Sequence, residues 1–450
     1  MERIVAAFGL IAIIGMAFAI SAHKRRVDWR LVFWGTALQF ILGVVVLKTE
    51  PGRALFSYAN EAFKAVLGFS RDGASFVFGN LVDQNVPVGT SESGGPNGSV
   101  TLTAGTWART GALFAFGVLP TVIFFSSVMA VTYHLGLMHR VVSALAWVMK
   151  RTLRTSGAES LSAAANIFVG QTEAPLLIRP YLARMTNSEI LAVMVGGMAT
   201  IAGGVLAAYV GMLSERFPDI AGHLIAASVM SAPASLVIAK LILPETETPE
   251  TSGGTEVPHV RVDSNVIDAA TRGASEGLSL ALNIAAMMVA FIGLIAFANG
   301  LWGLGCRWAS EVSGLNLSSI DSLQEVLGYA FAPLAFLMGV PTQDCVIAGQ
   351  FIGEKTILNE FVGYAHMGDY LNGRPLIAGT PVQDLTERTK VILSYAMCGF
   401  ANFGSIGILV GGLSSLAPER RKDFANLGLR ALIGGSLASF MTAAIAGMLL

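Results

Sequence analysis

The stretch from Asn166 to Pro175 constrains the fold of this chain most strongly, because it inserts polar side chains between long apolar segments. Gly170 and Pro175 both disfavour a regular helix through this polar cluster. An ionisable side chain on an interrupted helix at membrane depth indicates a functional site. The polar residues are one carboxylate, two amides and one hydroxyl: Glu173, Asn166, Gln171 and Thr172.

The composition is that of an integral membrane protein. The chain has 450 residues, of which 53% are hydrophobic and 13% charged, with a mean hydropathy of +0.63. Soluble domains carry about 25% charged residues. The net charge of −1 and the lack of a basic patch argue against nucleic acid as a partner. A soluble turn between amphipathic helices is the alternative for residues 166–175, and the apolar flanks disfavour it.

Residue types that support enzymatic chemistry are not grouped in this sequence. Cys306, Cys345 and Cys398 are widely spaced, which predicts neither a disulfide framework nor a metal site. The chain contains no GxSxG, HExxH or Walker motif, and its six histidines are scattered. We therefore expect no enzyme activity and no cofactor.

Uncharged segments of membrane length predict eight transmembrane helices. Basic clusters at 23–30, 139–154 and 420–422 fall on the same side, which predicts a cytoplasmic face and both termini outside. The first 22 residues lack an early basic cluster, so they predict a first crossing rather than a cleaved signal. The predicted crossings are residues 4–22, 31–47, 110–133, 190–213, 220–242, 277–302, 391–416 and 431–450.

Two further segments predict re-entrant hairpins, the first at residues 155–183. There the apolar length on each side of Gly170 is too short for two full crossings, so we expect two half-length helices entering from the cytoplasm. The second segment begins with uncharged residues 326–343, broken by Gly339-Val-Pro341. Asp344 then opens a helix that carries Lys355, Asn359 and Glu360, and this hairpin enters from outside.

The two halves of the chain show the same pattern. Each hairpin precedes a long uncharged helix with small or polar residues in its middle, at 200–204 and 402–405. Interrupted helices at matching positions of an inverted repeat indicate the binding site of a secondary transporter. We therefore expect an all-α polytopic membrane protein with eight transmembrane helices, two opposed re-entrant helical hairpins in an inverted repeat, and interfacial helices at 54–67 and 263–276.

The polar residues of these elements define two candidate sites. Two carboxylates with neighbouring amides and hydroxyls can bind a neutral substrate rich in hydroxyl and amide groups. Half-helix ends expose unpaired carbonyls, which suit a hard cation such as sodium. The candidate substrate residues are Gln171, Thr172, Glu173, Glu360, Asn402 and Ser405. The candidate cation residues are Asn166, Val169, Thr200 and Ile201.

Each candidate also has a structural interpretation. The Thr200 hydroxyl can bond its own helix backbone, and Asn402 can form an interhelical hydrogen bond. Phe400 can simply pack against lipid or core. The two carboxylates can be paired for structure, Glu173 with Arg179 and Glu360 with Lys355.

Five segments together resemble the concentrative nucleoside transporters, in the form of a bacterial member. The resemblance covers most of the chain, and its motifs are long. They are Ala163–Val169 (AAANIFV), Gly170–Leu182 (GQTEAPLLIRPYL), Met198–Gly203 (MATIAG), Asn359–Val362 (NEFV) and Cys398–Gly407 (CGFANFGSIG).

The resemblance implies sodium-driven uptake of nucleosides such as uridine by an elevator-type movement. It also implies a homotrimer in the lipid bilayer of the inner membrane, with a scaffold domain and a mobile transport domain in each protomer. It places the nucleobase at Gln171, Thr172 and Glu173, with Val205 and Phe400 nearby. It places the ribose at Glu360, Asn402 and Ser405, and sodium at Asn166, Val169, Thr200 and Ile201.

The implied organisation divides the chain into seven parts. Residues 1–109 form an N-terminal scaffold part with an external loop, and 110–154 the third crossing with a cytoplasmic interfacial helix. Residues 155–242 form the first half of the transport domain, 243–276 a cytoplasmic loop with an interfacial helix, and 277–302 a scaffold crossing. Residues 303–416 form the second half of the transport domain and 417–450 the C-terminal crossing.

Two positions depart from the family pattern, and three other functions stay open. Gly404 stands where the family often has Ser, and Gly363 where it often has Ala, which we interpret as packing changes that alter base preference. A proton-coupled symporter would use Glu173 or Glu360 as the proton carrier. A channel or a receptor would need a continuous polar pore or a signalling domain, and the chain indicates neither.

Overall fold

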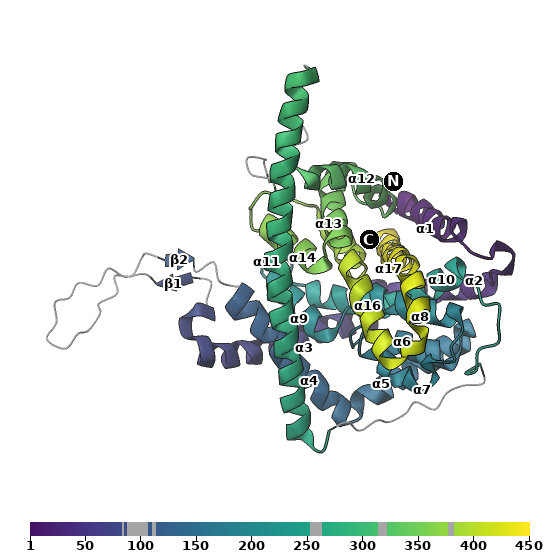
Figure 1. The fold of residues 1–450 in the computed structure, drawn as a ribbon. Coiled ribbons are helices and arrows are strands. Elements are labelled where there is room, and N and C mark those ends of the chain that lie inside the picture. Colours follow the sequence, from purple (N-terminus) through teal and green to yellow (C-terminus); the bar gives the residue numbers. More distant parts are fainter. Residues whose placement is uncertain (83–84, 88–106, 110–113, 253–262, 314–321, 377–381) are drawn as a thin grey trace, which may run out of the picture.

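The computed structural model describes residues 1–450 except 83–84, 88–106, 110–113, 253–262, 314–321 and 377–381 (Figure 1). The described chain is helical apart from two three-residue strands, β1 (Asn85–Pro87) and β2 (Trp107–Arg109), which pair antiparallel. The expected external loop at 89–98 lies outside the described residues. The two ends of the chain lie together, since the Arg3 guanidinium donates to the carbonyl of Leu450.

Among the described residues, seven helical segments are long and apolar enough to cross a membrane. Two shorter apolar helices, Leu323–Leu337 and Phe403–Leu416, accompany them. The predicted fold class, an all-α polytopic membrane protein, is confirmed. The long segments are Glu2–Ala19, Trp29–Lys48, Ala115–His134, Asn187–Leu213, Ile220–Ile242, Val266–Trp308 and Pro418–Leu449.

The N-terminal third contains helices α1 to α5. Local capping explains two of the starts. Asp28 accepts from the amide of Arg30 at 2.9 Å and begins α2, and Thr49 accepts from Gly52 at 3.1 Å and begins α3. The helix α3 is much longer than the interfacial piece expected at 54–67. The bounds are α1 Glu2–Ala19, α2 Trp29–Lys48, α3 Glu50–Phe78, α4 Leu119–His134 and α5 Leu137–Leu153, with a π-helical turn over Phe114–Val118 before α4.

The helix α11 (Val266–Ser313) is one continuous helix, which stands along one side of the molecule (Figure 1). The sequence predicted an interfacial helix to 276 followed by a separate crossing from 277, and that division was wrong. Gly273 and Gly277 do not break the helix. They bring it against α4, where a Cβ on Gly273 would lie 2.6 Å from the Ser126 carbonyl oxygen. Close helix approach, rather than a turn, explains these glycines.

The remaining helices form two sets in the same order. Each set has a packing helix, a helical hairpin, an interrupted helix and a long buried helix, as the predicted repeat requires. The first set is α5, α6 (Gly157–Ala165) with a 3₁₀ turn (Ala174–Ile178) and α7 (Arg179–Leu182), α8 (Asn187–Ala199), α9 (Gly203–Leu213) and α10 (Ile220–Ile242). The second set is α12 (Leu323–Leu337), α13 (Cys345–Ile357), α14 (Glu360–Leu371), α15 (Glu387–Ala396), α16 (Phe403–Leu416) and α17 (Arg421–Leu449).

Both uncharged crossings that follow the hairpins are broken in the structure. The predicted helix 190–213 stops at Ala199 and resumes at Gly203, and the predicted helix 391–416 stops at Ala396 and resumes at Phe403. Extended backbone at Thr200 and at Asn402 accounts for the breaks. Asn402 then caps α16 by accepting from the amide of Ser405 at 2.9 Å.

The second hairpin lies later in the chain than predicted. The predicted break at Gly339-Val-Pro341 only joins α12 to α13, and α13 ends at Ile357 and does not include Glu360. Asn359 caps α14 through the amide of Val362 at 2.9 Å, and Glu360 is its first residue. The chain reverses direction between α13 and α14. A Glu354 carboxylate oxygen lies 3.0 Å from the His366 Nδ1, and the ring centres of Phe351 and Tyr370 lie 5.9 Å apart.

Candidate functional site

The breaks of the two interrupted helices lie against each other. Gly399, in the break between α15 and α16, has a φ of +134°, which favours glycine. A Cβ at this position would lie 2.7 Å from the Met198 carbonyl oxygen and 2.9 Å from the Ala199 carbonyl carbon. The end of α8 therefore touches the second break directly. Two segments about 200 residues apart in sequence meet at the centre of the fold, where neither is helical.

Hydrogen bonds hold the tip of the first hairpin against the break between α8 and α9 and against α10. The Phe168 carbonyl accepts from the amide of Gly203 at 3.0 Å, and the Ser228 hydroxyl of α10 donates to the Ile167 carbonyl at 3.1 Å. Gly197 of α8 leaves room for Gln171, because a Cβ added to Gly197 would lie only 2.8 Å from the Gln171 Cβ. These contacts hold the tip against α8, α9 and α10, so its polar residues have fixed positions.

The four predicted sodium residues lie at this junction. Asn166, Thr200 and Ile201 are buried, and Val169 is half-buried. The Asn166 amide oxygen is buried without a hydrogen-bond partner, and an added Cβ on Gly197 would lie 3.8 Å from it. Among the described residues, no hydrogen bond reaches the carbonyl oxygens of Val169, Thr200 or Ile201. Oxygen atoms without partners are the ligands that a hard cation takes.

The Thr200 hydroxyl bonds the backbone of its own helix, as its structural interpretation expects, since it donates to the Gly196 carbonyl at 2.9 Å. The hydroxyl oxygen keeps its acceptor capacity in that bond. No group of three or more His, Cys, Asp or Glu side chains that could hold a metal occurs in the described part of the chain. A cation at the junction would therefore rely on carbonyl, amide and hydroxyl oxygens, which suits a weakly bound monovalent ion.

The predicted ribose residues form one buried hydrogen-bond network. Glu360 is 5% exposed, and its Oε2 accepts from the Asn402 amide at 2.8 Å. The Asn402 oxygen in turn accepts from the amide of Ser405. The Glu360 Oε1 accepts from the Tyr209 hydroxyl at 3.0 Å, a partner that the sequence did not predict. The structure thus brings Glu360, Asn402 and Ser405 together, and adds Tyr209.

The predicted nucleobase residues differ in exposure. Gln171 is buried with its side-chain oxygen unpaired, whereas Thr172 and Glu173 have exposed side chains. Thr172 lies beside α16, since a Cβ on Gly412 would be 3.0 Å from its methyl carbon. Glu173 therefore stands at an accessible surface of the tip, where a ligand can reach it.

The helix α9 contacts both the first hairpin tip and the predicted ribose residue Glu360. Its first residue bonds the hairpin tip at Phe168, and Tyr209 bonds Glu360. Val205 is buried on the same helix one turn before Tyr209, and Phe400 is half-buried in the second break. Among the described residues, no direct hydrogen bond joins the hairpin tip to Glu360 or Asn402. Tyr209 was not predicted from the sequence, where it is one aromatic residue among many.

Neither carboxylate forms the ion pair that was its structural interpretation. The described residues contain no Glu173–Arg179 pair and no Glu360–Lys355 pair within 4.0 Å. Lys355 is fully buried without a hydrogen-bond partner, and its ammonium lies 5.9 Å from the centre of the Phe440 ring. Neither carboxylate is therefore held in an ion pair within the described part of the chain, and Lys355 is buried without the partner that its structural interpretation gave it.

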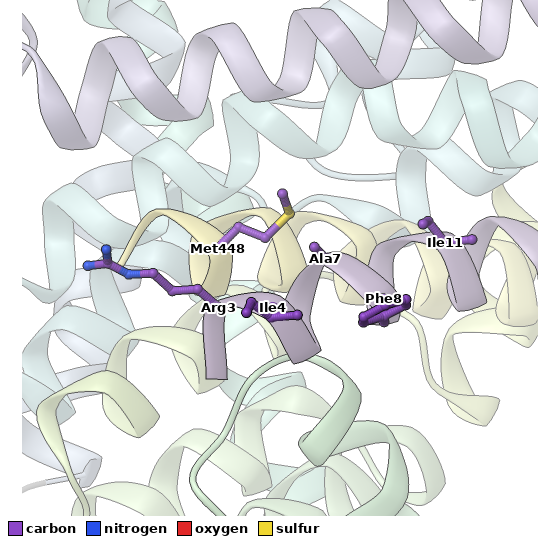
Figure 2. A pocket seen from close by; sticks show the side chains of 6 residues that line it. All are labelled: Arg3, Ile4, Ala7, Phe8, Ile11 and Met448. Atoms are coloured by element: carbon purple, nitrogen blue, oxygen red, sulfur yellow. The ribbon is translucent and has the colours of Figure 1, made fainter. Parts of the chain in front are cut away.

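A surface groove lies elsewhere, at the two chain ends. Figure 2 shows it between α1 and the end of α17, lined by Ile4, Phe8, Ile11 and other residues. Its lining is apolar apart from Arg3, and it contains none of the predicted site residues. The groove therefore does not compete with the helix breaks as the candidate site.

Comparisons with known proteins agree with this geometry. The family description "Na+ dependent nucleoside transporter C-terminus" matches residues 223–447, the corresponding N-terminal description matches residues 8–81, and "Nucleoside recognition" matches residues 115–216. The rat proteins "Solute carrier family 28 member 3" and "Sodium/nucleoside cotransporter 1" are 41% and 42% identical over the whole chain. The chain spans 59% and 64% of the length of these relatives.

A solved structure of similar size shows the same architecture. "CNTnw in an inward-facing substrate-bound state" matches with a TM-score of 0.84 and 41% identity, covering 100% of this chain and 98% of the other. Further structures of CNTnw variants represent outward-facing and intermediate states. The matches extend over the helices that carry both interrupted segments, so the chain belongs to the concentrative, Na+-dependent nucleoside transporters, a family of transporters and not of enzymes.

Proposed function

We propose that the protein is a sodium-coupled symporter that imports nucleosides across a bacterial inner membrane. The observation that carries this proposal is the buried network of Glu360, Tyr209, Asn402 and Ser405 at the meeting point of two interrupted helices. A carboxylate buried at this depth needs donors. A ribose offers neighbouring hydroxyl donors, and family membership supports a nucleoside as their source.

The base end of the substrate would meet the first hairpin tip. Gln171 and Thr172 offer an amide and a hydroxyl, and Glu173 offers a carboxylate that accepts from ring or exocyclic N–H groups. Val205 and Phe400 provide apolar surface between the tip and the ribose network. This division gives each polar side chain of the site a partner on the substrate, so an analogue that lacks the ribose hydroxyls leaves buried Glu360 without those partners.

Sodium would bind between Asn166, Val169, Thr200 and Ile201. The unpaired Asn166 oxygen and the free carbonyls at this junction support the assignment. The ion would tie the end of α6 to the start of α9, and so order the tip that holds the base. Coupling then follows, because the substrate binds best to a tip that the ion has already ordered.

Transport would proceed by an elevator-type movement of the two hairpins and interrupted helices against a scaffold of the N-terminal helices and α11. The inward-facing, outward-facing and intermediate structures of CNTnw support such a cycle. We further propose a homotrimer with both termini outside, and the transport and scaffold boundaries predicted from the sequence, except the division at 276–277 that α11 spans. The alternative coupling ion is a proton carried on Glu173 or Glu360.

The test is uptake of radiolabelled uridine into proteoliposomes with an inward sodium gradient, no gradient, or an acid-outside gradient in sodium-free buffer. We expect accumulation above equilibrium only with sodium. Accumulation that requires acid instead would replace sodium by a proton. If no gradient drives accumulation, the symporter proposal is wrong, and saturable equilibration alone would indicate a facilitator.

A further inference from the structure

Tyr209 is a fully buried tyrosine in the middle of α9. Its hydroxyl donates to Glu360 Oε1 at 3.0 Å. Its ring packs on the ring of Tyr364, with centres 4.3 Å apart, and against Phe361 at 5.3 Å. Side chains in a close-packed core sit in rotamer minima, and these ring contacts pack Tyr209 in that way. The hydroxyl group therefore has one position, and that position faces the carboxylate of the binding site.

The donors to Glu360 come from both halves of the fold. Tyr209 lies on α9 and bonds Oε1, while Asn402 precedes α16 and bonds Oε2 at 2.8 Å. With a donor on each oxygen, the plane of the carboxylate has a defined orientation. A carboxylate has about four acceptor positions, so capacity remains for substrate hydroxyl groups after these two bonds form.

Fixing this carboxylate matters for recognition of neighbouring hydroxyl groups. Two hydroxyls on adjacent carbons can donate together to a carboxylate only when its oxygens lie at the right positions. A freely rotating glutamate would lose side-chain entropy each time a substrate binds. A glutamate that is already oriented avoids this loss and binds substrates with two hydroxyls preferentially.

We propose that Tyr209 is a positioning residue that sets the preference of the site for substrates with two neighbouring sugar hydroxyls. The inference rests on the proposed function, since it concerns the same carboxylate. Tyr209 acts through Glu360, and its hydroxyl controls how strongly the protein distinguishes a riboside from an analogue without the 2′ and 3′ hydroxyls.

The chain offers a matched control in Tyr364. This residue is also fully buried and belongs to the same ring pair. Its hydroxyl donates at 2.9 Å to the Ser394 carbonyl rather than to Glu360. Tyr364→Phe therefore removes a buried phenol hydroxyl from the same cluster while leaving the donors to Glu360 in place.

The experiment measures uridine uptake and its inhibition by 2′,3′-dideoxyuridine in proteoliposomes with a sodium gradient. For Tyr209→Phe we expect the KM for uridine to rise about 5- to 10-fold, the scale of one ordinary hydrogen bond, because the lost bond orients Glu360 and does not itself contact the substrate. The inhibition constant of dideoxyuridine should change less than about 2-fold. For Tyr364→Phe, the ratio between the two ligands should stay that of the unmodified protein. Equal weakening of both ligands in Tyr209→Phe, or the same ratio change in Tyr364→Phe, would overturn the proposal.

A second comparison guards against misfolding of the single variant, in which a buried carboxylate loses a donor. Tyr209→Phe is combined with Glu360→Gln, which removes the charge that needs that donor. The double variant should distinguish uridine from dideoxyuridine no better and no worse than Glu360→Gln alone. A further change in the ratio would mean that Tyr209 acts independently of Glu360. Failure of the unmodified protein to accumulate uridine would instead refute the proposed function.

Discussion

At the scale of single residues, the protein contains a carboxylate, that of Glu360, which is both buried and held by hydrogen bonds. Burial of an ionised group is costly unless hydrogen bonds compensate for lost water. Glu360 receives a bond on each oxygen, from Tyr209 and from Asn402. Both donors are themselves buried and held by their own elements. The network therefore keeps the carboxylate in place before a substrate arrives.

The variant Glu360→Gln tests the ribose assignment. A glutamine keeps the volume but loses one acceptor oxygen, so bonds to ribose hydroxyls weaken while contacts to the base remain. We expect uridine affinity to fall roughly 10- to 100-fold, the scale of a hydrogen bond to a charged group, and dideoxyuridine affinity to fall much less. Equilibrium binding to the purified protein with sodium measures both ligands.

The control for this variant is Glu354→Gln. Glu354 is another buried carboxylate on α13, 1% exposed, whose oxygens meet His366 rather than the network around Glu360. Its change should leave the ratio of uridine to dideoxyuridine affinity unaltered. If Glu360→Gln weakens the two ligands equally, Glu360 does not hold the ribose.

At the scale of elements, hydrogen bonds between helix caps tie each hairpin to the interrupted helix that follows. In the first half, Ser156 caps α6 and its hydroxyl donates at 2.6 Å to Glu189 of α8. In the second half, Asp344 precedes α13 and accepts from the Thr386 hydroxyl, before α15, at 2.9 Å. Different residues thus make the same connection in both halves. Each hairpin and its interrupted helix are joined at their outer ends.

The connection between α6 and α8 also includes a buried ion pair. Lys240 of α10 lies 2.8 Å from Glu159 of α6 and 3.2 Å from Glu245, and donates to Ser188 of α8 at 2.9 Å. Lys240→Met would leave Glu159, 2% exposed, without its cation. We expect the free energy of unfolding to fall by about 3–5 kcal/mol, the cost of breaking a buried pair. Denaturant unfolding of the purified protein measures the change.

The matched control is Lys64→Met on α3. Lys64 lies 3.1 Å from Glu61, whose side chain is 66% exposed, so water compensates for the lost charge. This variant should change the free energy of unfolding by no more than about 1 kcal/mol. Similar losses in both variants would show that Lys240 does not stabilise the junction of α6, α8 and α10.

At the scale of the whole molecule, two sets of helices meet at their non-helical segments. Gly399 contacts the end of α8, and the long helices of the two sets also touch, since the hydroxyls of Ser231 on α10 and Thr442 on α17 lie 3.3 Å apart. The proposed sodium junction belongs to the first set, and the ribose network to both. A change at the first hairpin tip can therefore reach Glu360 through α9.

This arrangement predicts reciprocal coupling between the two ligands. Sodium should tighten uridine binding, and uridine should tighten sodium binding by the same factor, because the coupling free energy is shared. We expect a factor of about 5 to 150, the usual range for coupled sites. Calorimetric titration of each ligand at several fixed concentrations of the other measures both factors. A factor of about 1, with neither ligand changing the affinity of the other, would show that the two sites are not coupled.

The sequence by itself determined the class of fold and predicted which residues form the site. Uncharged apolar length is a local property, so most of the apolar segments and the first hairpin were predicted from composition and glycine or proline breaks. The second hairpin was predicted too early in the chain, because the Gly339–Pro341 break joins α12 to α13 and is not the hairpin tip. The resemblance in motifs then supplied the ribose group of Glu360, Asn402 and Ser405, and the structure brings these residues together. Roles for the hairpin tip and for the four sodium residues stay predictions.

Only the tertiary structure decided where the apolar helices break and what surrounds the carboxylate. An interruption at Thr200 or Gly399 depends on close contact with another segment, which no local pattern records. The continuous α11 likewise depends on glycines that pack against α4. Tyr209 resembles any other core aromatic in the sequence, and only the packing of α9 places its hydroxyl within hydrogen-bond distance of Glu360. Such hydrogen bonds between distant segments require the packed fold.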